Sequence, residues 1–298
     1  MYDQIAANKR NSFIIVAFFF LLVALLGYFL GVLFSTPLTG LVFGLVFSLF
    51  FFLLQYYNGD KLILKVVGAR PANPRNPKEL YLINTVEGLA IAAGIPTPKV
   101  FVIKDDAINA FATGRNPANA SVAVTTGALE KLDRLELEGV IAHEISHIKN
   151  YDVLFMLLTV TLIGVTIMLS DFLRRLAFYG DHDSDNGLLL LVAVVFSLLA
   201  PLAAYLMHFA LSRQREFLAD ANGALLTRYP EGLASALEKI LEDEKKGKDV
   251  VVDSVEVNRA VAPLFFSNPL KRRGFVSNLF STHPPLEERI KRLRGVNI

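Results

Sequence analysis

Residues 133–152, DRLELEGVIAHEISHIKNYD, predict one helix that carries a metal-binding motif. Asp133 and Glu136 have the spacing of a capping box, in which two side chains satisfy free backbone N–H groups at a helix start. His143 and His147 are four residues apart, so a helix places both imidazoles on one face, within reach of one ion. We therefore expect a helix from Asp133 through His147.

The same stretch contains the motif HExxH, in which a glutamate follows the first histidine. Glu144 would lie at the flank of a bound metal, where its carboxylate can take a proton from a water molecule. The alternative is a helix that exposes two surface histidines. An apolar stripe on this helix argues against two surface histidines, because the stripe would bury the helix, and burying imidazoles without partners is energetically costly. The stripe consists of Leu137, Val140 and Ile141.

Composition narrows both the possible ligands and the environment. The chain has 298 residues and no cysteine, so a metal site must use histidine, aspartate or glutamate, and no disulfide can form. Hydrophobic residues make up 53% and charged residues 19%, with a mean hydropathy of +0.44, which indicates a membrane protein. The net charge of +2 gives no reason to expect a nucleic-acid partner.

Four long apolar runs predict four transmembrane helices, since about 20 apolar residues cross the hydrocarbon core. They are residues 13–34, 38–57, 153–170 and 188–207. The third run is near the minimum length for a transmembrane helix. The alternative for the third and fourth runs is therefore a buried helical hairpin of a soluble protein. The runs divide the chain into a first hairpin, a first soluble part with the HExxH helix, a second hairpin and a second soluble part: residues 1–58, 59–152, 153–210 and 211–298.

Basic residues beside the runs predict the orientation in the membrane. Lys9 and Arg10 precede the first run, Lys61 and Lys65 follow the second, and the loop between the runs has no charge. Cytoplasmic segments next to spans are enriched in lysine and arginine. Both termini and the soluble parts are therefore expected in the cytoplasm, although arginines after the third run weaken this for the second hairpin.

The soluble parts combine strand and helix signals. Residues 99–104, 109–114 and 121–126 predict short strands, for which a small antiparallel sheet is the simplest arrangement. A polar, proline-rich linker is predicted from Gly59 onward. Helices are predicted at 79–93, at 231–244 and after Pro284-Pro285. The expected fold is a mostly α membrane protein with four transmembrane helices and a cytoplasmic α+β domain that carries the small sheet.

The third metal ligand must lie outside the HExxH helix, because Asn150 and Val153 occupy the later positions of the metzincin pattern. If the last two apolar runs form a hairpin, their cytoplasmic ends are neighbours. His147 and Glu216 then lie at similar heights, roughly 10 Å above the membrane boundary at 1.5 Å per helical residue. Asp220, one turn further on, could orient a ligating histidine. The alternatives are a solvated acid for Glu216 and a surface carboxylate for Asp220.

Three protein ligands leave a fourth tetrahedral position for water, which is typical of a catalytic zinc site. The motif thus predicts one Zn²⁺ per chain and metal-assisted hydrolysis. Zinc would lower the pKa of the water and polarise the scissile carbonyl, while Glu144 takes the proton and passes it to the leaving amine. A neighbouring donor is expected to stabilise the tetrahedral oxyanion.

The motifs resemble those of the bacterial HtpX membrane metalloproteases, which are related to the eukaryotic CAAX prenyl endopeptidases. The resemblance covers most of the chain and rests on the four apolar runs and on HEISHIKN (143–150), SRQREFLADA (212–221) and THPPLEERI (282–290). It implies a gluzincin-type protease domain in which His143, His147 and Glu216 bind zinc. It also implies that Glu144 is the catalytic acid and base.

The resemblance implies roles for two further segments. Asn109, Ala110, Phe111 and Ala112 would belong to an edge strand on which an extended peptide docks by strand addition. A plain sheet edge is the alternative. His283 would donate to the oxyanion, whereas the prolines that follow it indicate only a helix start with His283 near the N-cap.

The expected function is an endopeptidase of the bacterial plasma membrane. The resemblance implies that its substrates are misfolded or damaged membrane proteins, cleaved at the cytoplasmic face as quality control during stress. One alternative is a processing peptidase with a narrow substrate range. Another is a non-catalytic membrane scaffold with structural zinc. Glu144 argues against this alternative, because a structural zinc site does not need a base beside a ligand. The oligomeric state stays open.

Overall fold

The computed structural model describes residues 2–159, 175, 213–245, 264–266 and 284–295. Its elements, in chain order, are α1 (Tyr2–Leu33), α2 (Pro37–Val66), β1 (Arg70–Pro71), α3 (Pro77–Ala93), β2 (Lys99–Ile103), β3 (Ala110–Asn116), β4 (Asn119–Thr125), α4 (Thr126–Lys131), α5 (Arg134–Lys149), α8 (Arg213–Thr227), α9 (Pro230–Lys245) and α10 (Leu286–Arg294). Residues 152–159 are also helical.

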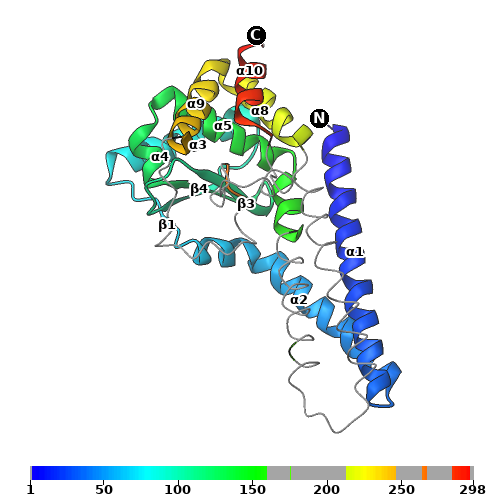
Figure 1. Cartoon of the computed structure of the whole chain (residues 1–298). Coiled ribbons are helices and arrows are strands. Elements are labelled where there is room, and N and C mark those ends of the chain that lie inside the picture. The colour runs from blue at the N-terminus through cyan, green and yellow to red at the C-terminus, as the bar shows by residue number, and fades with distance from the viewer. Residues whose placement is uncertain (1, 160–174, 176–212, 246–263, 267–283, 296–298) are drawn as a thin grey trace.

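Helices α1 and α2 form a hairpin that projects from the rest of the described chain (Figure 1). Both are long and apolar enough to cross a membrane, over Ile5–Val32 and Pro37–Val66. Only 33% and 11% of their most apolar windows are buried, whereas a core helix of a soluble protein is mostly buried. The described residues therefore contain two of the four predicted spans. Residues 160–170 of the third run and all of 188–207 lie outside them.

The hairpin is held at its tip by close backbone packing. Each helix carries two glycines four residues apart, and the two pairs face each other: Gly27 and Gly31 on α1, Gly40 and Gly44 on α2. A side chain at Gly27 or Gly40 would overlap the backbone of the other helix, and one at Gly44 would approach the Val23 carbonyl to 2.7 Å. Small residues at this spacing let two membrane helices approach closely.

Replacing Gly40 by alanine is therefore expected to destabilise the hairpin. The added methyl group forces the helices apart, which costs about 1–3 kcal/mol. The measurement is the free energy of unfolding by sodium dodecyl sulfate in mixed micelles. Gly88→Ala is the matched control, because a side chain at Gly88 meets nothing within 4 Å and alanine stabilises a helix by about 0.5–1 kcal/mol over glycine. Equal stability of the two variants would contradict the close packing.

Helix α2 does not end where the polar linker was predicted, and that prediction is wrong for its first residues. The helix continues from Tyr57 to Val66. This part is amphipathic: Ile63 and Leu64 are buried in a cluster with Phe111 and Ala123 of the sheet, while the lysines face outward. Burial of these apolar side chains stabilises the extra turns and joins the hairpin to the sheet.

The sheet has the strand order β1-β2-β4-β3. Strand β4 pairs antiparallel with β3 but parallel with β2, so the predicted purely antiparallel sheet is wrong and the sheet is mixed. The short turn at Asn116–Asn119 fixes only the β3–β4 pair. Residues 120–125 are buried, and β4 therefore takes the central position between β2 and β3. Within the described residues, strand β3 is an edge of the sheet.

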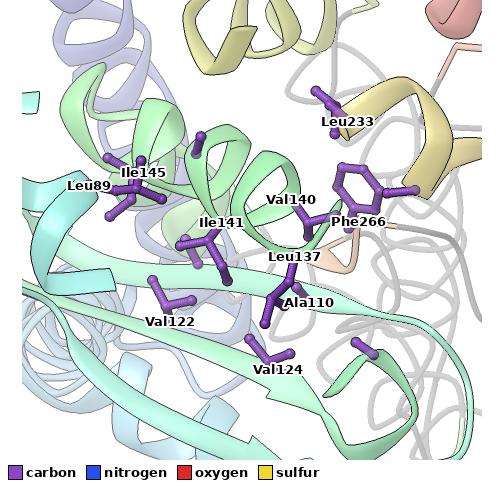
Figure 2. Close-up of a cluster of buried hydrophobic side chains, with 14 of the residues drawn as sticks. Leu89, Ala110, Val122, Val124, Leu137, Val140, Ile141, Ile145, Leu233 and Phe266 are labelled. Atoms are coloured by element: carbon purple, nitrogen blue, oxygen red, sulfur yellow. The ribbon is translucent and has the colours of Figure 1, made fainter. Parts of the chain in front are cut away.

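Helix α5 lies across the sheet and begins with the predicted capping box between Asp133 and Glu136. Its apolar stripe points at the strands, as Figure 2 shows, where Ile141 and Leu137 lie above Val122 and Val124. Helices α8 and α9 also contact α5. Because α5 is enclosed in this way, every residue from Val140 to Ile148 is buried, including both histidines.

Candidate metal centre

The structure brings His143 and His147 of α5 together with Glu216 of α8. One side-chain nitrogen or oxygen of each lies within 4.8 Å of the others. The two Nε2 atoms are 3.1 Å apart, and the Glu216 carboxylate oxygens lie 3.7 Å from His143 Nε2 and 3.5 Å from His147 Nε2. Helix α8 approaches α5 at Gly223, where even a Cβ would lie 3.1 Å from the His143 backbone nitrogen.

The His143 imidazole is oriented by a carboxylate and a guanidinium group. His143 Nδ1 lies 2.9 Å from Asp220 Oδ1. Arg289 of α10 donates to both oxygens of Asp220, from Nε at 2.9 Å and from Nη2 at 2.7 Å. Its Nη1 lies 3.7 Å from Glu216 Oε2. Asp220 therefore lies where the sequence placed it, beside a histidine, and Arg289 fixes its rotamer.

The His147 imidazole has a partner of its own, Asp152. His147 Nδ1 donates to Asp152 Oδ2 at 3.0 Å, and Asn8 Nδ2 of α1 donates to Asp152 Oδ1 at 2.6 Å. Asp152 comes within reach because the chain turns back at Tyr151, which has a φ of 61°. Both histidines thus have a carboxylate on Nδ1.

The sequence interpretation missed Arg289, Asp152 and Asn8. A signal for Arg289 was present, since the apolar spacing of Leu286, Ile290 and Leu293 places Arg289 on the buried face of a helix. Asp152 had no such signal, because helical spacing does not place it beside His147. His283 lies outside the described residues.

The donor set fits a divalent metal. An ionised carboxylate only accepts hydrogen bonds, so each Nδ1 must carry a proton, and each Nε2 presents a lone pair when its imidazole is neutral. Two lone pairs and a carboxylate then face one point, where no pair of these groups can hydrogen-bond without a further proton. Two imidazoles and a glutamate are a ligand set found in catalytic zinc sites.

The charges around this point also fit a dication. Among the described residues that surround the imidazoles, four buried carboxylates face two buried guanidinium groups: Glu144, Asp152, Glu216 and Asp220 against Arg215 and Arg289. The excess of two negative charges would be neutralised by one divalent cation. Without a cation, protons reduce this excess instead, because unpaired charges are costly in a buried site.

The pKa values of the two histidines differ for a physical reason. Burial and the Arg289 charge lower the pKa of His143 to about 4, against the raising effect of Asp220. Burial also lowers the pKa of His147, but the hydrogen bond to Asp152 and the charge of Glu216 outweigh it and raise the value to about 9. Binding of a metal at pH 7 therefore displaces a proton from His147.

Glu144 lies beside the imidazoles in a pocket. Burial raises the pKa of its carboxyl group to about 7, with a further raising contribution from Glu216, while the His147 charge and a backbone hydrogen bond with Ala112 lower it. The pocket includes the three residues that could hold a metal. It is lined by Ala112, His143, Glu144, His147, Met156, Glu216, Leu264, Phe265 and Phe266.

The predicted docking strand lies against this pocket. Ala110, Phe111 and Ala112 belong to β3, the edge strand, and Asn109 directly precedes it. The edge is in part covered by the chain itself, because the Phe266 N–H donates to the Ala110 carbonyl at 2.8 Å. Phe266 also packs edge-on against the His143 imidazole, with ring centroids 5.0 Å apart.

Asp220→Asn is expected to lower zinc affinity roughly 10–100-fold, since partners behind metal ligands contribute that much. The asparagine cannot accept from His143 and from both Arg289 nitrogens as a carboxylate does, and it leaves the guanidinium charge uncompensated. The measurement is the zinc dissociation constant from competition with a chromophoric chelator. Asp243→Asn is the control, since its pair with Lys131 is partly exposed and such pairs contribute about 0–1 kcal/mol. Unchanged zinc affinity in Asp220→Asn would contradict this role.

Comparisons with known proteins identify the family of the chain. The model of "Peptidase family M48" matches residues 76–297, which include both parts of the site. A "Protease HtpX homolog" from Dictyoglomus thermophilum is 49% identical over 98% of this chain and 94% of its own length. One from Streptococcus gordonii is 43% identical over 99% of each chain.

A solved structure shares the fold. The crystal structure of S. mikatae Ste24p superposes with a TM-score of 0.54 and 19% identity, over 98% of this chain and 67% of that one. The HExxH helix, the glutamate on α8 and a family match over most of the sequence point to one conclusion. The chain is a metallopeptidase and belongs to peptidase family M48.

Proposed function

We propose that this metallopeptidase is a zinc endopeptidase of the cell membrane, in which His143, His147 and Glu216 hold one zinc ion and Glu144 is the catalytic acid and base. The observation that carries the proposal is the buried point shared by two imidazole lone pairs and the Glu216 carboxylate. Each imidazole is held by a carboxylate of its own, so the ligands are oriented before a metal binds.

The chain's own groups supply most of the chemistry. Bound zinc would contribute Lewis-acid polarisation and a lowered pKa of the attacking water. Glu144 is next to the first ligand and lines the pocket, so its carboxylate takes the proton of the water and returns it to the leaving amine. The apolar wall of Met156, Phe265 and Phe266 excludes other water, which strengthens these electrostatic interactions.

Strand β3 is proposed as the docking edge for an extended peptide. It is an edge of the sheet, it lies against the HExxH helix, and its Ala112 lines the pocket. The hydrogen bond from Phe266 to Ala110 supports the proposal, because the bond uses a backbone carbonyl that strand addition would use. A bound peptide would replace this contact, with Ala110 and Ala112 offering backbone groups and Asn109 at the end of the strand.

The proposed substrates are misfolded or damaged membrane proteins, cleaved at the cytoplasmic face of a bacterial plasma membrane during stress. The apolar hairpin of α1 and α2 supports a membrane location. Strand addition binds a peptide mainly through backbone hydrogen bonds and not through particular side chains, which suits unfolded substrates of varied sequence. A proteomic comparison of cells with the wild type and with Glu144→Ala tests this. Accumulation of many membrane proteins is expected, whereas accumulation of a single protein would indicate a dedicated processing peptidase.

Removal of the metal tests the proposed chemistry. Purified protein in detergent is expected to cleave unfolded casein, to lose this activity with its zinc on treatment with a chelator, and to regain it with one equivalent of zinc. Cleavage that continues after the zinc has been removed would contradict the proposal. Stoichiometric zinc without any cleavage would instead favour a structural scaffold.

A further inference from the structure

The first membrane helix reaches the metal centre through a single polar side chain. Asn8 of α1 is 1% exposed and its Nδ2 donates to Asp152 Oδ1 at 2.6 Å. The other oxygen of the same carboxylate, Oδ2, accepts from His147 Nδ1 at 3.0 Å. One uninterrupted path of hydrogen bonds therefore leads from the hairpin to an imidazole of the ligand group.

The orientation of the Asn8 amide is fixed by its surroundings. Its Nδ2 donates a second hydrogen bond, to the Asn150 carbonyl at 2.9 Å, so both of its hydrogens are used. A flipped amide would place its oxygen against two acceptors. Asn8 is itself fixed within α1, where Ser12 Oγ donates to its backbone carbonyl at 2.8 Å.

The two histidines are thus supported in the same way from opposite ends of the chain. Behind His143, Asp220 is held by Arg289 of α10. Behind His147, Asp152 is held by Asn8 of α1, while the Arg215 guanidinium is more distant, with Nε 3.8 Å from Oδ1. A carboxylate that loses its short hydrogen bond on one oxygen can rotate, and its grip on the imidazole then weakens.

We propose that Asn8 is a positioning residue for the metal centre, because its amide fixes Asp152 in the orientation that holds the His147 imidazole towards the metal. The inference rests on the proposed zinc site and deepens it. It makes the hairpin of α1 and α2 part of the metal site as well as a membrane anchor. A displacement of α1 from the protease domain would therefore lower the affinity for zinc. The peptidase site is fully formed only when α1 packs against the domain and Asn8 contacts Asp152.

The test is a double-mutant cycle on zinc affinity in the full-length protein. Zinc dissociation constants are measured for the wild type, Asn8→Ala, Asp152→Ala and the double variant by competition with a chromophoric chelator. Asp152→Ala is expected to weaken binding roughly 10–100-fold. Asn8→Ala is expected to weaken it about tenfold, near the lower limit for the loss of one hydrogen bond to a charged group. The double variant is expected to bind zinc no more weakly than Asp152→Ala alone.

Two further variants separate positioning from mere docking of the helix. Asn8→Leu keeps the buried volume but has no donor. It is expected to bind zinc as weakly as Asn8→Ala, and it takes the place of the alanine variant if that variant does not fold. Lys9→Ala removes a neighbouring contact of α1, the Lys9 ammonium 4.3 Å from the Tyr151 ring, without touching Asp152. It is expected to change zinc affinity less than twofold, within roughly 0.4 kcal/mol. The visible spectrum of the cobalt-substituted protein should change in Asn8→Leu and not in Lys9→Ala.

Three results would overturn the inference. They are an unchanged zinc affinity in both Asn8 variants, independent effects of Asn8→Ala and Asp152→Ala that multiply in the double variant, or an equal loss in Lys9→Ala. In each case the wild type still binds zinc tightly, so the proposed function stands. If the wild type itself fails to bind zinc, both the proposed function and this inference are wrong.

Discussion

Glu144→Gln is expected to lower kcat/KM for an unfolded protein substrate by about 10²–10⁴-fold, the usual contribution of a general acid and base. Glutamine has nearly the shape of glutamate but cannot take a proton from water. Because Glu144 is not one of the three proposed ligands, the variant should keep its zinc. Loss of activity with full zinc content would show that Glu144 acts as a base and not as a metal ligand.

The measurement combines casein cleavage with zinc content per chain. Glu138→Gln is the matched control, since Glu138 is on the same helix α5 and outside the pocket. This control should cleave at the wild-type rate. If Glu144→Gln retained more than a tenth of the activity, another group would have to activate the water, and the role of Glu144 would be wrong.

Glu216→Gln is expected to abolish both tight zinc binding and peptidase activity. The substitution removes the only carboxylate among the three proposed ligands and one of the negative charges that offset the cation. The affinity should therefore fall by more than the roughly 100-fold upper value for partners behind the ligands. Glu216 is 3% exposed, so solvent cannot replace its charge cheaply.

Zinc content after dialysis against a weak chelator measures this effect. Glu130→Gln, an exposed position on α4, is the control for the loss of one carboxylate. It should retain one zinc per chain. A Glu216→Gln variant with full zinc content and full activity would mean that the third ligand lies elsewhere in the chain.

Local patterns predicted the local structure well. The capping box of Asp133 and Glu136 and the apolar stripe fixed both the start and the buried face of α5, and so the direction of both imidazoles. Glu216 was predicted to lie near His147 because both residues are at similar distances from the membrane boundary along their helices. The structure places the Glu216 carboxylate 3.5–3.7 Å from the imidazoles. Asp220 followed from the helical repeat that relates it to Glu216.

Features that depend on distant contacts escaped prediction. Asp152 reaches His147 only through the left-handed backbone of Tyr151, which no spacing rule encodes. Asn8 meets Asp152 across 144 residues. The parallel pairing of β2 with β4 arises because a later strand inserts between two earlier ones, a choice made by burial of β4 and not by its turns. His283 and most of the second hairpin, residues 160–174 and 176–210, lie outside the part of the chain that the structure describes.

X-ray absorption at the zinc edge of the purified, zinc-loaded protein tests the central claim most directly. Two imidazole nitrogens and one carboxylate oxygen should appear in a four-coordinate shell at about 2.0–2.2 Å, with the fourth position taken by a light atom of solvent. A shell of oxygen atoms alone, or one with a single imidazole, would show that α5 and α8 do not share the metal. In that case the account of hydrolysis given above would be wrong.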